Sequence, residues 1–143
     1  MRIVTYNFLR AGSLKRCGHW SRVIRSLKPD LLGGDFNIAV GYRPPRDRIR
    51  MLRGERDILD RLTNEFELVS CWQAANPDRP LAQTLRWTGN PSAPYHCDGI
   101  FVPRSWLPLL ISCRVVRGSR WKQLSDHNPV VAEFREKATN FIA

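Results

Sequence analysis

Short apolar runs separated by long polar connections dominate this chain, and they limit it to folds built on several short strands. The β-branched run Arg2–Tyr6 predicts a first strand. Leu31 and Leu32 begin a second strand, which continues directly into Gly33-Gly34-Asp35. The other predicted strands cover residues 68–72, 84–87, 99–102, 109–116 and 129–134.

Two stretches have helical periodicity instead. Apolar residues recur every three or four positions in Ser13–Lys28, and Pro29 ends that run. Asp57–Phe66 shows the same amphipathic pattern. Two helices with about seven short strands and irregular connections predict an α+β sandwich, because alternating βαβ units would need regular crossovers.

The length of 143 residues suits a single domain, and no stretch resembles a linker between domains. We expect one domain over residues 1–137 and a C-terminal tail over residues 138–143. The start of the chain lacks an apolar signal segment, and no apolar run approaches the ~20 residues of a membrane helix. These features predict a cytoplasmic protein without membrane contact. The four cysteines are irregularly spaced and are expected to be reduced.

The chain is strongly basic, with a formal net charge of +10 and a pI near 10.3. Arginine outnumbers lysine, and its planar guanidinium matches the geometry of phosphate. This balance predicts nucleic acid or another phosphate ester as the partner. The arginine-rich segment 42–56 reads as an exposed loop that could contact nucleic acid, or as a loop that is merely solvated. The candidate contact residues are Arg43, Arg46, Arg48 and Arg50.

Polar side chains gather where the apolar runs begin or end. The groups are Asn7, Asp35 with Asn37, Asp98, and Asp126 with His127. A carboxylate at the end of a strand stays at the rim of a core, where neighbouring groups can hold it rigidly. Each group alone also has a local explanation, since Asp and Asn side chains often bond nearby backbone amides. No single group decides between these readings.

Taken together and in order, four segments resemble the endonuclease/exonuclease/phosphatase superfamily. Met1–Asn7 is similar to its opening strand, and Gly34–Asn37 is similar to its central Gly-Asp-x-Asn motif. His96–Val102 matches the segment in which an aspartate precedes a hydrophobic strand, and Ser125–Val130 matches the closing Ser-Asp-His motif. The resemblance implies a four-layer α-β-β-α sandwich of the deoxyribonuclease type. It also implies a metal-dependent phosphoesterase, most like a nuclease, that uses Mg²⁺ (or Mn²⁺).

The resemblance also implies the catalytic residues. Asp35 would orient and deprotonate the attacking water, and Asn37 would hold Asp35 and the phosphate in register. His127 would donate to a phosphoryl oxygen, with Asp98 orienting the imidazole and favouring its charged form.

The metal ligands implied by the resemblance are the amide oxygen of Asn7 and the carboxylate of Asp126, both hard oxygen donors. Family members carry a further stretch, with a Gln-Glu pair that supplies a principal metal ligand, before the central motif. Here Leu32 runs directly into Gly33, so that glutamate is missing. We therefore expect weakened metal affinity, an incomplete N-terminal half, and self-association through the sheet left uncovered.

Three functions remain open on this basis. The first is a metal-dependent phosphoesterase, and the second is a catalytically inactive remnant that binds nucleic acid through its basic surface. The third is a shortened gene product without a stable function. Magnesium-dependent cleavage of DNA separates the first from the others.

Overall fold

A computed structural model describes residues 2–5, 14–43, 51–86 and 95–136, with residues 14–20 described through their backbone. The expected tail over residues 138–143 therefore lies outside the described residues. The elements in chain order are β1 (Ile3–Thr5), α1 (Leu14–Leu27), β2 (Leu31–Asp35), α2 (Arg53–Asn64), β3 (Leu68–Ser70), α3 (Cys71–Ala75), β4 (Asp98–Pro103), the 3-10 helix η1 (Arg104–Leu109), β5 (Leu110–Val115), α4 (Ser119–Leu124) and β6 (Val130–Phe134). No helix in these ranges has the length and apolar character needed to cross a membrane.

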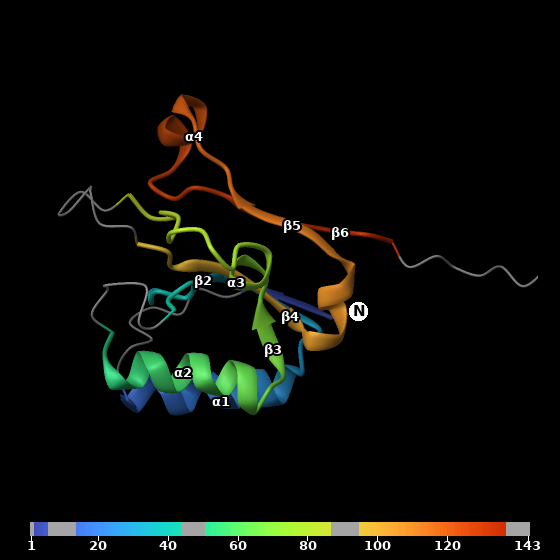
Figure 1. The fold of residues 1–143 in the computed structure, drawn as a ribbon. Coiled ribbons are helices and arrows are strands. Elements are labelled where there is room, and N and C mark those ends of the chain that lie inside the picture. The colour runs from blue at the N-terminus through green and yellow to red at the C-terminus, as the bar shows by residue number, and fades with distance from the viewer. Residues whose placement is uncertain (1, 6–13, 44–50, 87–94, 137–143) are drawn as a thin grey trace, which may run out of the picture.

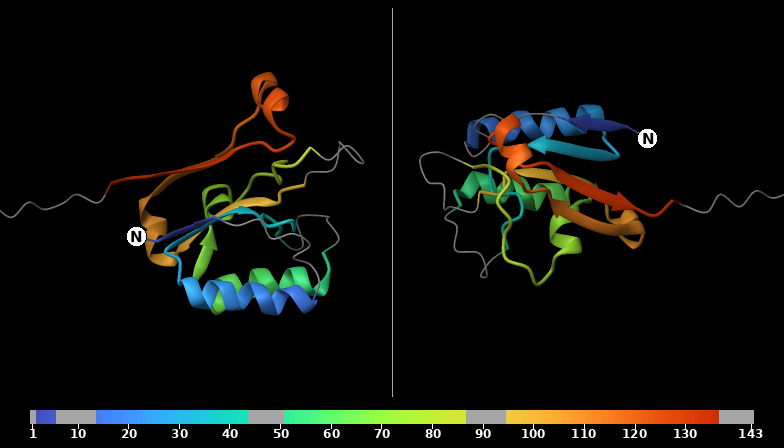
Figure 2. Two further views of the ribbon diagram at one scale, coloured as in Figure 1. Left: turned by 180° about the vertical axis from the view of Figure 1, so that it is seen from behind. Right: turned by 90° about the horizontal axis from the view of Figure 1, so that it is seen from above.

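Two sheets stack in the molecule. The larger sheet has the strand order β1-β2-β4-β3, in which β1 and β2 are parallel and the other pairs are antiparallel. Helices α1 and α2 lie side by side on one face of this sheet, and the antiparallel pair β5–β6 lies on the other face (Figure 1, Figure 2). Among the described residues only short helices accompany the second sheet: α4 at one end of the β5–β6 pair (Figure 1), α3, which contacts β5, and η1, which leads into β5. The arrangement is the predicted α+β sandwich in incomplete form.

Strand β2 runs without interruption across the Leu32–Gly33 junction. Leu32 is fully buried and pairs with β1 on one side and with Phe101 of β4 on the other. Gly34 has φ of +142°, a conformation that side chains rarely adopt, so glycine is needed there. A Cβ added to Gly33 would make only ordinary van der Waals contact. The segments before and after the Leu32–Gly33 junction therefore form one continuous strand.

The first core lies between α1, α2 and the larger sheet. Ile58 and Leu62 of α2 are fully buried and belong to one cluster with Ile24 of α1 and with Phe36. Helix α2 begins at Arg53, earlier than the predicted Asp57, so the prediction of an exposed loop up to residue 56 is wrong at its end. The reason is a cap: Glu55 Oε2 accepts a hydrogen bond from Leu52 N at 2.6 Å, satisfying a backbone donor at the start of the helix.

The second core lies between the two sheets. Val102 of β4 and Cys113 of β5 are buried there with Trp72. The strand predicted over residues 68–72 ends at Ser70, because Ser70 Oγ accepts a hydrogen bond from Gln73 N at 3.3 Å and so begins helix α3. This helix turns Trp72 into the space between the sheets.

Candidate active site

Asp35 and Asp98 lie opposite each other at one end of the two central strands of the larger sheet, β2 and β4. Asp35 is the last residue of β2 and Asp98 is the first residue of β4. Because these strands are antiparallel, the end of one meets the start of the other, and Asp35 pairs with Asp98 in the sheet register. Two carboxylates that are 63 positions apart in the sequence (98 − 35) are thereby brought to one rim.

Asn37 holds the carboxylate of Asp35. Its backbone N–H donates to Asp35 Oδ1 at 2.9 Å, and its side-chain amide donates to Oδ2 at 3.0 Å. This geometry needs the left-handed backbone of Asn37, whose φ is +52°, a conformation that asparagine adopts more readily than most residues. Phe36 between them is fully buried and anchors the turn. The Asp-x-Asn spacing is thus a device that fixes both oxygens of one carboxylate.

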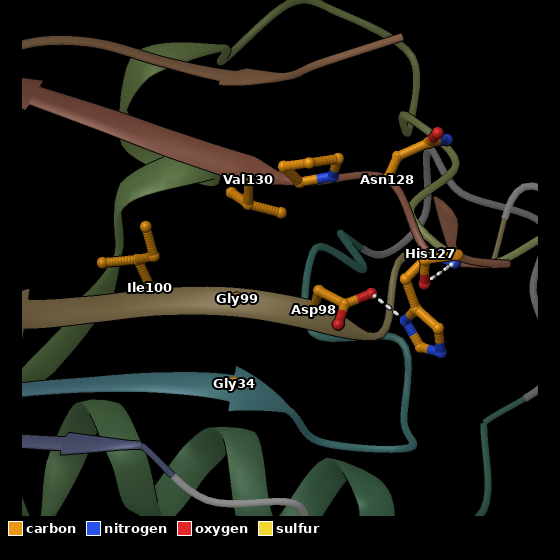
Figure 3. A pocket seen from close by; sticks show the side chains of 9 residues that line it. Gly34, Asp98, Gly99, Ile100, His127, Asn128 and Val130 are labelled. Atoms are coloured by element: carbon orange, nitrogen blue, oxygen red, sulfur yellow. Dashed lines mark hydrogen bonds and ion pairs between the residues drawn. The ribbon is translucent and has the colours of Figure 1, made fainter. Parts of the chain in front are cut away.

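His127 is held by Asp98. Its Nδ1 lies 2.8 Å from Asp98 Oδ2, a hydrogen bond in which the protonated nitrogen donates (Figure 3). The other ring nitrogen, Nε2, lies 4.0 Å from Asp126 Oδ1. The side chain of His127 is 29% exposed and that of Asp98 is 19% exposed, so the pair is partly shielded from water. Asp98 orients the ring and leaves Nε2 available for a reacting group.

Three carboxylates act on the imidazole of His127. Burial is the largest single influence and lowers the pKa of His127. The hydrogen bond that His127 donates to Asp98 and the charges of Asp98, Asp35 and Asp126 raise it, and the net result is a pKa above its ordinary value of 6.5. The charged imidazolium is therefore favoured, and its proton can be donated to an anionic oxygen.

Replacing Asp98 by Asn is expected to lower the pKa of His127, because burial would then be opposed only by the more distant Asp35 and Asp126. An NMR titration of the imidazole resonances measures the change. A raised pKa stabilises the fold below the unfolded-state pKa of about 6.5, and this stabilisation disappears as pH rises through the folded-state pKa. The Asp98→Asn protein should therefore lose its extra stability at acidic pH.

The matched control for this titration is Asp126→Asn. The Asp126 side chain is 72% exposed, so solvent screens its charge and the pKa of His127 should move less. A pKa of His127 that is unchanged in Asp98→Asn would show that Asp98 does not hold the ring in solution.

Thr84 holds the backbone that carries Asp98, and it was not predicted as a site residue. Its Oγ1 accepts hydrogen bonds from Cys97 N at 2.9 Å and from Asp98 N at 3.1 Å, and the residue is fully buried. Its backbone oxygen accepts from Asn128 N at 2.6 Å. The strand predicted over residues 84–87 is wrong for the described residues 84–86, which make a single bridge between Leu85 and His127. A single threonine between Gln83 and Leu85 carries no sequence signal for this role.

The loop that carries His127 is fixed by Arg86 and Asn128, which were likewise not predicted. Arg86 donates its backbone N–H to Asp126 O at 2.9 Å, and its guanidinium donates to Ser125 O and to Asn128 Oδ1. Asn128 is 5% exposed and donates from its own amide to Gln83 O at 3.0 Å. These contacts hold both sides of the His127 backbone.

A cavity of about 290 Å³ lies beside the Asp98–His127 pair, between β4 and the segment leading into β6 (Figure 3). Its lining residues are Gly34, Asp98, Gly99, Ile100, Ser125, His127, Asn128, Pro129 and Val130. The absence of a side chain at Gly99 is required here, since a Cβ would lie 2.9 Å from the ring of Phe101.

The remaining predicted site residues are placed differently. Asn7, the expected metal ligand, lies outside the described residues, and so do the expected nucleic-acid contacts Arg46, Arg48 and Arg50. Arg43 is described and partly buried, and its guanidinium donates to the backbone oxygens of Asn76, Pro77 and Arg79. These contacts give Arg43 a structural role in holding the turn at residues 76–79, so we leave it out of the nucleic-acid surface.

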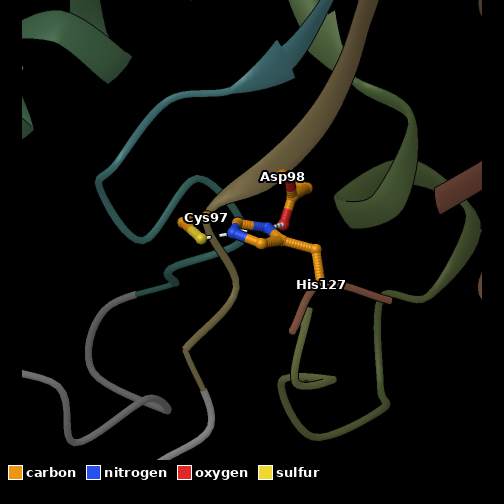
Figure 4. Close-up of side chains that lie close together, drawn as sticks. All are labelled: Cys97, Asp98 and His127. Atoms are coloured by element: carbon orange, nitrogen blue, oxygen red, sulfur yellow. Dashed lines mark hydrogen bonds and ion pairs between the residues drawn. The ribbon is translucent and has the colours of Figure 1, made fainter. Parts of the chain in front are cut away.

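Cys97 lies against the same pair, and one potential ligand atom from each of Cys97, Asp98 and His127 lies within 4.8 Å of the others (Figure 4). The cysteine is 5% exposed, and burial, followed by the charges of Asp98 and Asp35, raises the pKa of its thiol strongly. Without a metal ion the thiol is therefore protonated. Its Sγ donates to Asp98 Oδ2 at 3.7 Å, so the cluster is a chain of hydrogen bonds ending at His127.

A scan against protein-family models gave no match, and no curated protein matched in sequence. Solved structures do match. The 3′ phosphatase NExo from Neisseria, bound to a product DNA hairpin, superposes with a TM-score of 0.71 at 20% identity, covering 94% of this chain and 61% of that one. An AP endonuclease from Archaeoglobus fulgidus gives a TM-score of 0.70 at 15% identity, with 92% and 60% covered.

The catalytic domain of APE2 from Xenopus laevis gives a TM-score of 0.54 at 19% identity, covering 73% of this chain and 36% of that one. At these identities the likeness shows the fold alone. The chain thus has the fold of the exonuclease and AP endonuclease structures, which the sequence motifs predicted, and it spans about 61% of the length of the first of them.

Proposed function

We propose that this chain, which has the endonuclease/exonuclease/phosphatase fold in shortened form, is a metal-dependent phosphoesterase that hydrolyses phosphodiester bonds in nucleic acid. The observation that carries the proposal is the meeting of Asp35, Asp98 and His127 at one rim beside a cavity. A further support is that NExo, a structural neighbour, is described with a product DNA hairpin.

The described residues suit two proton transfers. Asp35, held by two N–H donors of Asn37, takes a proton from the attacking water. His127, charged and oriented by Asp98, donates from Nε2 to an anionic phosphoryl oxygen, where charge accumulates in the transition state.

The implied ion is Mg²⁺ (or Mn²⁺), and the residues of this chain fit a loosely held, hydrated ion. Asp126 is 72% exposed and offers a hard carboxylate oxygen near His127. Asn7 is the second expected ligand. In the part of the chain that the structure describes, no glutamate lines the cavity beside His127. A bound ion would supply positive charge at the phosphate, where phosphodiester hydrolysis needs it.

Magnesium is expected to activate this protein only at high concentration. Losing a charged ligand that contributes about 1.4 kcal/mol or more weakens binding about tenfold or more. Half-maximal cleavage should therefore need at least about tenfold more Mg²⁺ than a superfamily member that carries the Gln-Glu pair, measured in parallel on the same substrate. Equal half-saturation of the two proteins would show that the missing glutamate has been replaced.

The test of the proposal is cleavage of three substrates: plasmid DNA, a duplex with an abasic site, and an oligonucleotide with a 3′ phosphate. Cleavage that requires added metal, stops with EDTA and is absent from a His127→Ala preparation supports the proposal. Cleavage that persists in His127→Ala points to a contaminating nuclease.

A second candidate function is an inactive remnant that binds nucleic acid by charge. The missing glutamate and the net charge of +10 favour it. Salt-sensitive DNA binding without cleavage at any metal concentration would establish this function in place of the first.

Self-association through the second sheet remains a prediction. Ile111 of β5 is 62% exposed and Leu124 at the end of α4 is 70% exposed, so apolar surface is available there. Sedimentation analysis of the wild type beside Ile111→Lys measures it, and a monomer at all concentrations would contradict it.

A further inference from the structure

A second cavity, of about 520 Å³, adjoins the loop that carries His127, since Asn128 of that loop lines it. One wall is the turn at Arg117 and helix α4 with Lys122, and another is the segment from Gln83 to Arg86. Asn128 lines both this cavity and the one beside Asp98. The two cavities therefore share part of one wall.

Three cationic side chains and no carboxylate line this second cavity in the described part of the chain. They are Arg86, Arg117 and Lys122. Within the described ranges no ion pair joins any of them to an acidic residue. Like charges gathered around a cavity repel one another, so a bound anion would stabilise the arrangement.

Arg86 is positioned in advance for such an anion. Its guanidinium is held by Ser125 O and Asn128 Oδ1, which are neutral acceptors and leave its positive charge uncompensated. A guanidinium has five N–H donors, so some are left to face the cavity. A fixed arginine loses little conformational entropy when it binds phosphate. Arg117 and Lys122 are exposed and can close around the anion.

We propose that this cavity binds a backbone phosphate of the nucleic acid that lies next to the phosphate being cleaved. The inference rests on the proposed function. The connection is Arg86 and Asn128, which line the cavity and also hold the backbone on both sides of His127. A phosphate held here positions the strand so that its neighbour enters the cavity beside Asp98 and His127. Recognition is by charge and by the arginine fork, and it does not depend on base sequence.

The test measures the affinity of a labelled oligonucleotide in EDTA, with His127→Ala as the background so that no cleavage occurs. Arg117→Gln/Lys122→Gln is the test variant, because both side chains are exposed and the fold should tolerate the changes. Arg22→Gln/Arg104→Gln removes the same charge from exposed positions outside the cavity. The test variant should bind several-fold more weakly than this control. The slope of log affinity against log salt concentration should be smaller in magnitude by about 0.7–0.9, the value for one lost phosphate contact.

An oligonucleotide with one neutral methylphosphonate at the neighbouring position gives a second readout. It should weaken binding by the background and control proteins, and it should have little further effect on the test variant. Inorganic phosphate that competes equally in both variants would show only general charge attraction and overturn the proposal, as would equal oligonucleotide affinities. If the wild type cleaves no substrate but binding still depends on Arg117 and Lys122, the proposed catalysis fails while the phosphate site stands.

Discussion

Asp35→Asn is expected to reduce metal-dependent cleavage by about 10²–10⁴-fold, because an amide cannot take the proton of the attacking water. Asparagine has the same shape, and its side-chain oxygen can still accept the N–H of Asn37 that now holds the carboxylate at 2.9 Å. The fold should therefore be kept. Single-turnover cleavage with a saturating metal concentration separates the chemical step from metal binding.

The matched control for this variant is Asp60→Asn, since Asp60 is an exposed residue of α2 on the far side of the sheet from the second core. The control should cleave at the wild-type rate. Wild-type cleavage by Asp35→Asn would remove Asp35 from the proposed role. Loss of cleavage together with loss of folding, seen by circular dichroism, would mean that Asp35 acts structurally.

Thr84→Val is expected to lower the free energy of unfolding by about 2–4 kcal/mol, a large share of the about 5–15 kcal/mol of a typical domain. The substitution keeps the shape but removes the acceptor for two backbone N–H groups, those of Cys97 and Asp98. Both then lie buried without a partner. Denaturant unfolding measures the change.

Two further threonine variants serve as controls for Thr84→Val. Thr63→Val on α2 removes a hydroxyl whose only described contact is a 3.3 Å hydrogen bond to Leu59 O. This substitution should therefore lower the free energy of unfolding by well under about 1 kcal/mol. Thr84→Ser keeps the hydroxyl and should recover most of the loss. If Thr84→Val were as stable as Thr63→Val, the N–H groups would have another acceptor in solution.

The resemblance to the Gly-Asp-x-Asn motif supplied the roles of Asp35 and Asn37. The structure shows that the two residues interact directly, at a separation of only two positions in the chain. The amphipathic stretches of α1 and α2 also appear as predicted, because their apolar periodicity reports the face that packs on a sheet. The start of α2 was missed because its cap is formed by Glu55, a side chain with no place in the apolar pattern.

The pairing of Asp98 with His127 could not be predicted from spacing, since 29 residues separate them. The resemblance to known nucleases supplied it. Nothing in the sequence pointed to Thr84, because its importance comes from where its hydroxyl lies after folding. The basic segment 42–56 was predicted either to contact nucleic acid or to be a merely solvated loop, and Arg43 there instead holds a turn.

By itself the sequence determined the class of fold, the uninterrupted strand at Leu32–Gly33 and the chemistry of the polar groups at the strand ends. These depend on periodicity, on backbone freedom and on side-chain type, all of which are local. Only the tertiary structure decided that Asp35 meets Asp98 and that Arg86 lies beside Arg117 and Lys122. Strand pairing and loop closure bring together residues distant in the chain, and their positions follow from packing the whole molecule.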